Sequence, residues 1–198
     1  KEDVIRVIMA ARGEVRDYLW TIALTLGRMS EINRLEWKDV DFENNSLQLY
    51  TRKSRGGNLV PRTIPICSTL RDVLDRRRKG NPTQWVFWHR YWSKKAGEWV
   101  TGPYQRRNRI MKSLCDKAGV KYFRFHPLRH FGASQMMKEG VDPKTIQELL
   151  GHSNFRTTEI YLHLIRGTNQ DAVSKLDSML TGGGNVLRFE KRKTKTQD

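Results

Sequence analysis

The sequence predicts an α+β domain that is mostly α-helical and carries one small antiparallel β-sheet, formed as a hairpin. Three observations lead to this fold class. Apolar residues recur at intervals of three and four along most of the chain, which is the period of a buried helix face. Two short segments, 47–50 and 59–66, flank a basic, glycine-containing loop, as the strands of a hairpin do. A length of 198 residues suits one domain with a single core.

The first 66 residues are expected to hold three helices and then the hairpin. Pro61 and Pro65 place the second strand at a sheet edge, because proline cannot donate to the strand ladder. Ser30 is expected to cap the third helix. In chain order the expected elements are helices 2–11 and 15–26, a short helix after Ser30 that carries Ile32 and Leu35, and strands 47–50 and 59–66.

The chain from residue 68 on is expected to be helical apart from one short strand and the irregular stretch that follows it. Pro103, Pro127 and Pro143 each stand where the first turn of a helix would begin. The expected elements are helix 68–78, strand 85–88, an irregular stretch 89–101, and helices 103–118, 127–138, 142–150, 155–165 and 170–180. Residues 1–180 are thus expected to form the domain, and 181–198 a flexible tail that begins with three glycines.

The net charge points to a polyanionic partner. Lys and Arg number 37 against 21 Asp and Glu, which gives a formal net charge of +16. Such a charge favours nucleic acid as the partner over an acidic membrane surface or a merely solvated surface. The expected DNA-backbone contacts come from the basic stretches 52–58, 89–95 and 104–112, with Arg52, Arg55, Arg106, Arg107 and Arg109 as the candidates.

The remaining composition is that of a cytoplasmic protein. Cys67 and Cys115 are 48 positions apart, so no zinc motif is expected and both thiols are expected to be free. No apolar run is long enough to span a bilayer, and no signal peptide is visible. Because the chain starts at Lys1 without Met, a preceding N-terminal region is expected.

Several residues could together attack a DNA phosphate. Such chemistry needs a nucleophile, cations for the charge on the non-bridging oxygens, and a proton donor for the leaving oxygen. His126 and Arg129 lie three apart at a helix start, so they share one face. His152 and Tyr161 follow. The sequence shows no carboxylate cluster for a metal, and Glu31 is interpreted as a buried structural carboxylate.

In order and spacing, these residues resemble the tyrosine recombinase (phage integrase) family. His126-Pro-Leu-Arg129, Leu150-Gly-His152 and Tyr161 resemble the C-terminal signature of that family. Gly27-Arg-Met-Ser-Glu-Ile32 resembles its first arginine motif, although the family often has Gly two places before the arginine. Residues 51–54 and 62–66 look like its β-hairpin. The resemblance runs from about Val4 to Tyr161 and implies the catalytic-domain fold of that family.

The resemblance also implies a role for each residue. Tyr161 would attack the phosphate and form a 3′-phosphotyrosine link, while Arg28 and Arg129 hold the non-bridging oxygens. His126 would assist proton removal from the tyrosine or bind the phosphate, and His152 would bond a phosphate oxygen. Lys53 would protonate the departing 5′-oxygen, although Arg52 and Arg55 share its loop. No cofactor, metal or ATP is expected.

The expected function is site-specific DNA recombination, with integration and excision of a phage or mobile element favoured. Chromosome-dimer resolution or inversion is the alternative, and a non-catalytic DNA-binding module is the alternative of another class. The expected partners are duplex DNA with recombination sites, further copies in a tetramer, and accessory DNA-bending proteins. The free chain would be a monomer or weak oligomer, nucleoid-associated in a bacterial cytoplasm, without a membrane partner. Residues 170–190 are expected to dock on a neighbouring subunit.

The remaining aromatic and imidazole side chains are interpreted more plainly. Most of the four tryptophans Trp85, Trp88, Trp92 and Trp99 are expected to fill the core, although stacking on DNA bases is an alternative. His130 is expected to be a packing or hydrogen-bonding residue.

Overall fold

The computed structural model describes residues 2–52, 57–164, 173, 174, 176 and 178 of the chain. Lys1–Leu164 form one compact unit, and Ile165–Asp198 form another. The expected subunit-docking segment 170–190 lies almost entirely outside the described residues, and so does the expected tail 181–198.

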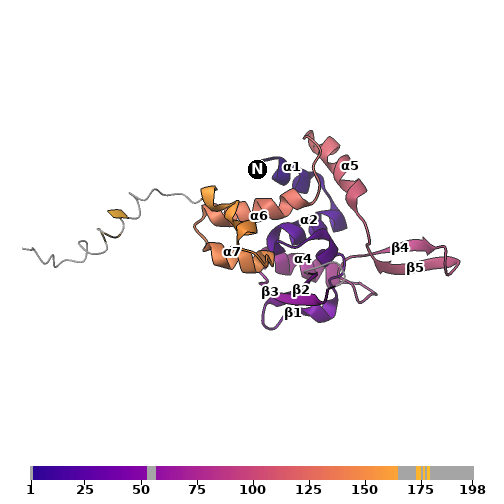
Figure 1. The fold of residues 1–198 in the computed structure, drawn as a ribbon. Helices are drawn as coiled ribbons and strands as arrows, with labels where there is room; N and C mark the ends of the chain where they lie inside the picture. The colour runs from indigo at the N-terminus through magenta and orange to yellow at the C-terminus, as the bar shows by residue number, and fades with distance from the viewer. Residues whose placement is uncertain (1, 53–56, 165–172, 175, 177, 179–198) are drawn as a thin grey trace, which may run out of the picture. The chain divides into compact units, whose positions relative to one another are not determined.

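Helices dominate the first unit, and two small antiparallel sheets complete it (Figure 1). The helices are α1 (Glu2–Ala10), α2 (Gly13–Thr25), α3 (Met29–Ile32), η1 (Trp37–Asp39), α4 (Ser68–Arg78), α5 (Asn108–Ala118), α6 (His126–Lys138), α7 (Pro143–Leu150), α8 (Arg156–Glu159) and η2 (Leu162–Leu164). The strands are β1 (Val40–Asp41), β2 (Ser46–Arg52), β3 (Leu59–Pro65), β4 (Trp88–Ser93) and β5 (Glu98–Pro103).

The first sheet has the order β1-β2-β3, and β3 is an edge strand in it. Leu47 pairs with Ile64 and Thr51 with Val60 across β2 and β3. Leu47, Leu49 and Ile64 are buried, which fixes the register because a one-residue slip would expose them. The predicted hairpin is therefore confirmed, and so are the α+β class and the largely helical content.

Two hydrophobic clusters place the helices that carry the predicted site. In the main core, α2 packs against α4 and α6 and buries Leu19 and Ile22. The second cluster joins Leu26 after α2, residues of α6 and α7, and Tyr161. Gly132 of α6 faces the end of α2. A Cβ there would lie 2.4 Å from Leu26 Cδ2 and 2.7 Å from the Ala23 carbonyl oxygen, so only glycine permits this approach.

Several expectations about the elements are corrected. The stretch 89–101 is not irregular, because most of it forms the β4–β5 hairpin, which extends away from the helices in Figure 1. Pro103 ends β5, and the helix begins at Asn108. Within the expected helix 155–165, the described residues form α8 followed by η2 rather than one helix.

Two smaller expectations also fail. The residue at the N-cap of α3 is Arg28 rather than Ser30, which lies within the helix. Trp92 and Trp99 are exposed on the hairpin, where they pair edge to face at 6.0 Å between ring centroids. They therefore do not fill the core.

Membrane insertion of a helix finds no support in the part of the chain that the structure describes. Among those residues, every helix is too short or too polar to cross a bilayer.

Candidate active site

Arg28 is held at the start of α3 by the buried carboxylate of Glu31. The Glu31 carboxylate accepts from the Arg28 backbone N–H at 2.8 Å and from Arg28 Nη1 at 2.9 Å. The Glu31 side chain is only 1% exposed, whereas that of Arg28 is 35% exposed. Arg28 therefore keeps a face toward solvent while its position is fixed, and Glu31 is the buried carboxylate that the sequence predicts.

Arg62 of β3 pairs with the same carboxylate and connects it to α7. Its Nη2 donates to Glu31 Oε2 at 2.7 Å, its Nε donates to the Leu149 carbonyl at 2.9 Å, and Nη1 also donates to the Thr51 hydroxyl. Burial raises the pKa of Glu31, but the hydrogen bonds and charge of Arg62 outweigh it and lower the pKa to about 2. The carboxylate is thus ionised at neutral pH.

Arg129 projects from the first turn of α6 and is almost fully buried. Its guanidinium donates through Nη1 to the Leu26 carbonyl and through Nη2 to the Leu150 carbonyl. Burial and the nearby Arg28 charge lower its pKa to about 9, so it stays cationic at neutral pH. Leu26 is left-handed (φ 51°) at the end of α2, which turns its carbonyl out of the helical hydrogen-bond pattern.

A pocket brings Arg28, Arg129 and His126 together. Its lining also includes Arg124 and Asn108, from the segments before α6 and at the start of α5. Burial and the charges of Arg129 and Arg28 lower the pKa of His126. The pocket is lined by cationic side chains and no carboxylate, so it suits a phosphate.

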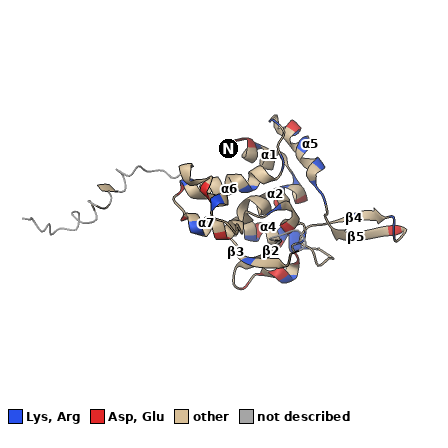
Figure 2. Cartoon of the chain, in the orientation of Figure 1, with Lys and Arg blue, Asp and Glu red and all other residues tan. Residues whose placement is uncertain are grey.

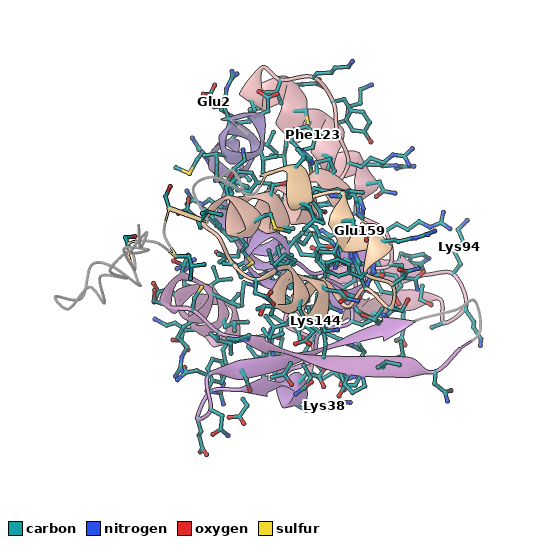
Figure 3. The ribbon with its side chains drawn as sticks, turned by 60° about the vertical axis from the view of Figure 1, so that its left-hand side comes forward. Glu2, Lys38, Lys94, Phe123, Lys144 and Glu159 are labelled. Carbon is teal, nitrogen blue, oxygen red and sulfur yellow. The ribbon has the colours of Figure 1, made fainter. Side chains whose placement is uncertain are left out.

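His152 follows α7, where Gly151 ends the helix in a left-handed conformation (φ 62°). A Cβ on Gly151 would lie 3.1 Å from Arg62 Cδ, so the turn packs tightly on the Arg62 side chain. His152 Nδ1 lies 3.0 Å from the Thr158 hydroxyl oxygen of α8. Figure 3, in which Lys144 marks α7 and Glu159 marks α8, shows these two helices side by side. Burial and the Arg129 and Arg28 charges lower the pKa of His152 to about 4, so its imidazole is neutral at pH 7.

Tyr161 lies between α8 and η2, with its ring in the second hydrophobic cluster and only 4% of its surface exposed. Its hydroxyl is hydrogen-bonded to Nδ1 of His130, one turn along α6 from His126. Burial raises the pKa of Tyr161, and the Arg129 charge opposes part of that rise. A phenol in this setting needs a proton acceptor before it can act as a nucleophile.

The structure therefore brings five of the six predicted catalytic residues into one region, from α3, α6 and the segments that follow α7 and α8. They are Arg28, His126, Arg129, His152 and Tyr161. Lys53 lies outside the described residues, directly after β2, and so does Arg55. The side chain of Arg52 is also not described.

The predicted DNA-backbone arginines divide into two groups. Arg106, just before α5, and Arg109, in its first turn, are exposed, which is compatible with binding to phosphate. Arg107 does not fit the prediction of a DNA-backbone contact, because it is only 5% exposed. Its guanidinium donates two hydrogen bonds to Glu14, at 2.7 and 2.6 Å, and stacks on Tyr104. Arg107 is therefore a structural residue that fastens the start of α5 to α2.

The described residues do not form a metal site. Within that part of the chain, no three His, Cys, Asp or Glu side chains lie where they could hold one ion together. The cationic groups of the pocket instead suit an anion directly.

Sequence reasoning missed two contacts of this site. It placed Arg62 only in a hairpin strand, and it left open what His130 would bond. The helical spacing of His126 and His130 puts both imidazoles on one face and could have suggested a shared role. The Glu31–Arg62 pair has no comparable local signal, since its members are 31 residues apart.

The model of the phage integrase family matches residues 1–166 of this chain, and this match decides the family. The chain belongs to the phage integrase family. Among its curated relatives is the tyrosine recombinase XerA of Pyrococcus furiosus, 30% identical over 92% of this chain and 63% of the relative. The integrase of Salmonella phage P22 is 27% identical over 87% of this chain and 45% of the relative.

Solved structures of phage integrase family members share this fold. A crystal structure of XerA recombinase matches 94% of the chain with a TM-score of 0.64 at 23% identity. The catalytic domain of bacteriophage HP1 integrase matches 90% with a TM-score of 0.62 at 20% identity, and 94% of that domain is covered. By contrast, the chain spans 63% and 53% of the length of two curated tyrosine recombinases. It therefore corresponds to part of such relatives.

Proposed function

We propose that this chain is the catalytic part of a site-specific DNA recombinase that cuts and rejoins strands through a 3′-phosphotyrosine intermediate. One observation carries the proposal. A buried tyrosine hydroxyl is hydrogen-bonded to the imidazole of His130 and lies in the same site as two arginines and two further histidines, which come from α6, the start of α3 and the segment after α7. Family membership supports the same chemistry.

In the proposed first step, the Tyr161 oxygen attacks phosphorus and displaces the 5′-oxygen of the next nucleotide. Arg28 and Arg129 would stabilise the charge that develops on the non-bridging oxygens, since planar guanidinium groups bind phosphate in a fixed geometry. His152 would donate a further hydrogen bond through Nε2, with Thr158 holding the opposite nitrogen.

Lys53 is proposed to protonate the departing 5′-oxygen. It directly follows β2, whose residue Thr51 is hydrogen-bonded within the Arg28–Glu31–Arg62 network. The turn end of the β2–β3 hairpin is thereby tied to the site. A lysine gives up a proton more readily than the neighbouring arginines Arg52 and Arg55 do.

Rejoining is proposed to reverse the same steps with a partner strand. The free 5′-hydroxyl of that strand attacks the phosphotyrosine, so one phosphoester replaces another and no bond energy is lost. We accordingly propose that neither ATP nor a metal ion is needed, because the arginines and histidines supply the charge stabilisation themselves.

The proposed partner is duplex DNA carrying a recombination site, bound by a tetramer of the whole protein, with accessory DNA-bending proteins. A protein acting on such a substrate would work in the cytoplasm at the nucleoid. Integration and excision of a phage or mobile element remain the favoured role. The P22 phage integrase among the curated relatives supports it. Chromosome-dimer resolution or inversion is the alternative.

A covalent-capture experiment tests the proposal. Binding sites are first selected from a randomised duplex pool with the Tyr161→Phe variant. They are then offered to the wild-type chain as nicked duplexes, in EDTA, and protein–DNA adducts are counted after denaturation. We expect a denaturation-resistant adduct with the wild type and none with Tyr161→Phe. Bound DNA that never forms an adduct would instead favour the non-catalytic DNA-binding module.

A further inference from the structure

His130 occupies the position next to the Tyr161 hydroxyl. Its Nδ1 is hydrogen-bonded to that hydroxyl, and the two ring centroids are 5.6 Å apart. His126, for which the sequence leaves two roles open, is more exposed and lines the pocket with Arg28 and Arg129. The two histidines of α6 therefore face different parts of the site.

The surroundings of His130 keep its imidazole neutral. The His126 ring packs against it edge to face, with 4.4 Å between centroids. The titratable and charged groups around it are His126 and Arg129 on its own helix, Tyr161 across from it, and His152 after α7. Burial, His126 and Arg129 all lower the pKa of His130. A neutral imidazole with its proton on Nε2 offers the Nδ1 lone pair to the Tyr161 proton.

We propose that His130 is the general base that takes the proton from Tyr161, while His126 binds the phosphate. This inference rests on the proposed function. In the cleavage step the Tyr161 O–H bond breaks and its proton passes to His130 Nδ1. The Tyr161 oxygen forms the new bond to phosphorus, and the bond from phosphorus to the 5′-oxygen breaks. The leaving oxygen takes its proton from a separate donor, and His130 returns its proton to Tyr161 when the strand is rejoined.

A base is required at this place because the phenol of Tyr161 is buried. The burial of Tyr161 raises its pKa, so the phenol stays protonated at neutral pH. A general base must lie within hydrogen-bond reach of the proton that it removes, and His130 does.

Single-turnover cleavage of the selected nicked duplex tests this role across a pH series. We compare wild type, His130→Ala, His130→Gln and, as a matched control, His163→Ala, whose imidazole is exposed two residues beyond Tyr161. His130→Ala is expected to slow adduct formation by about 100-fold or more, the usual contribution of a general base. His130→Gln, which can hydrogen-bond the hydroxyl but cannot take its proton, should be equally slow. His163→Ala should match wild type.

The pH profiles separate a base from a positioning residue. The wild-type rate should rise as His130 loses its proton and then level off, whereas the His130→Ala rate should keep rising toward the high pKa of the phenol. Added imidazole should partly restore His130→Ala. Full activity of His130→Gln, or a His130→Ala rate within a few-fold of wild type, would overturn the proposal.

A substrate with a bridging 5′-sulfur separates base from acid. Sulfur leaves without protonation, so this substrate should restore Lys53→Ala but not His130→Ala. Restoration of His130→Ala would assign His130 to the leaving group instead and overturn the proposal.

DNA affinity and thermal melting of each variant show that it is folded. If wild type forms no adduct, or Tyr161→Phe still does, the proposed function fails. An adduct that needs Tyr161 but not His130 removes this inference alone.

Discussion

At the scale of single residues, Glu31 organises the Arg28 side of the site. Its carboxylate accepts hydrogen bonds from Arg28, Thr51 and Arg62, which belong to three elements. Removing the charge would leave Arg62 buried without its partner, which is more costly than losing an exposed ion pair. Glu31 therefore contributes to stability as well as to the geometry of the site.

We expect the fold to lose stability in acid because of Glu31. Its pKa is lowered from 4.5 to about 2 in the folded chain. Its contribution to stability is therefore present above pH 4.5 and is lost as the pH falls through 2. A difference of this size corresponds to about 3 kcal/mol. Glu31→Gln should lower the free energy of unfolding by about that much at pH 7 and by much less at pH 2.

Urea unfolding at pH 7 and at lower pH measures this difference. Asp75→Asn is the matched control, because Asp75 pairs with Arg71 on the exposed side of α4. The control should change little at any pH. Equal stability of Glu31→Gln and wild type at pH 7 would show that the carboxylate does not hold the network together.

The residues predicted to be catalytic could be picked out of the sequence because each of their motifs is short and local. His126 and Arg129 are three apart, and Leu150-Gly-His152 is contiguous. Contacts such as Tyr161 with His130 depend instead on how α6, α7 and α8 pack. No local spacing in the sequence encodes that packing.

At the scale of elements, α6 carries His126, Arg129 and His130, and its placement against α2 sets the site. Gly132 makes that approach possible, and the Arg129 bond to the Leu26 carbonyl fastens it. Sequence periodicity predicted both helices. It did not show that a glycine inside α6 marks the point where they touch.

Substituting Gly132 should separate these helices. An added Cβ meets the Ala23 carbonyl oxygen at 2.7 Å, which cannot move without shifting α2. Gly132→Ala should therefore lower stability by about 1–3 kcal/mol, even though alanine favours a helix more than glycine does. Thermal melting measures the loss, with Ser134→Ala on the same helix as control. A Gly132→Ala variant as stable as wild type would contradict the close packing.

The β4–β5 hairpin was missed because neither of its faces is buried. Aromatic residues stand on both faces, as Tyr91 and Trp92 show, so no alternation of period two appears. The hairpin nonetheless includes most of the basic stretch 89–95, which is predicted to bind DNA phosphates. Lys94 points outward from it in Figure 3.

Neutralising the hairpin turn tests that predicted role. Lys94→Ala with Lys95→Ala should weaken duplex binding and make the affinity less dependent on salt, by about 0.9 in the log–log slope for each phosphate that the lysines neutralise. Fluorescence anisotropy at several salt concentrations measures the slope. Lys38→Ala is the control, since Lys38 is already paired with Glu36 at 2.6 Å. Identical slopes for the double variant and wild type would show that the hairpin turn does not bind the DNA backbone.

At the scale of the whole molecule, the net charge and the fold both agree with the proposed function, DNA recombination. The net charge of +16 was evident from composition, and Figure 2 shows basic positions on several helices and strands, interleaved with acidic ones. Composition could not show which arginines are available. Arg107 is buried against Glu14, whereas Arg106 and Arg109 beside it are exposed.

The central claim is that one tyrosine hydroxyl becomes covalently joined to DNA. Mass spectrometry of the protease-digested and nuclease-digested adduct tests it most directly. The account predicts a single modified peptide, with the 3′-phosphate of a nucleotide attached to Tyr161. Attachment to any other residue, or through a 5′-phosphate, would contradict it.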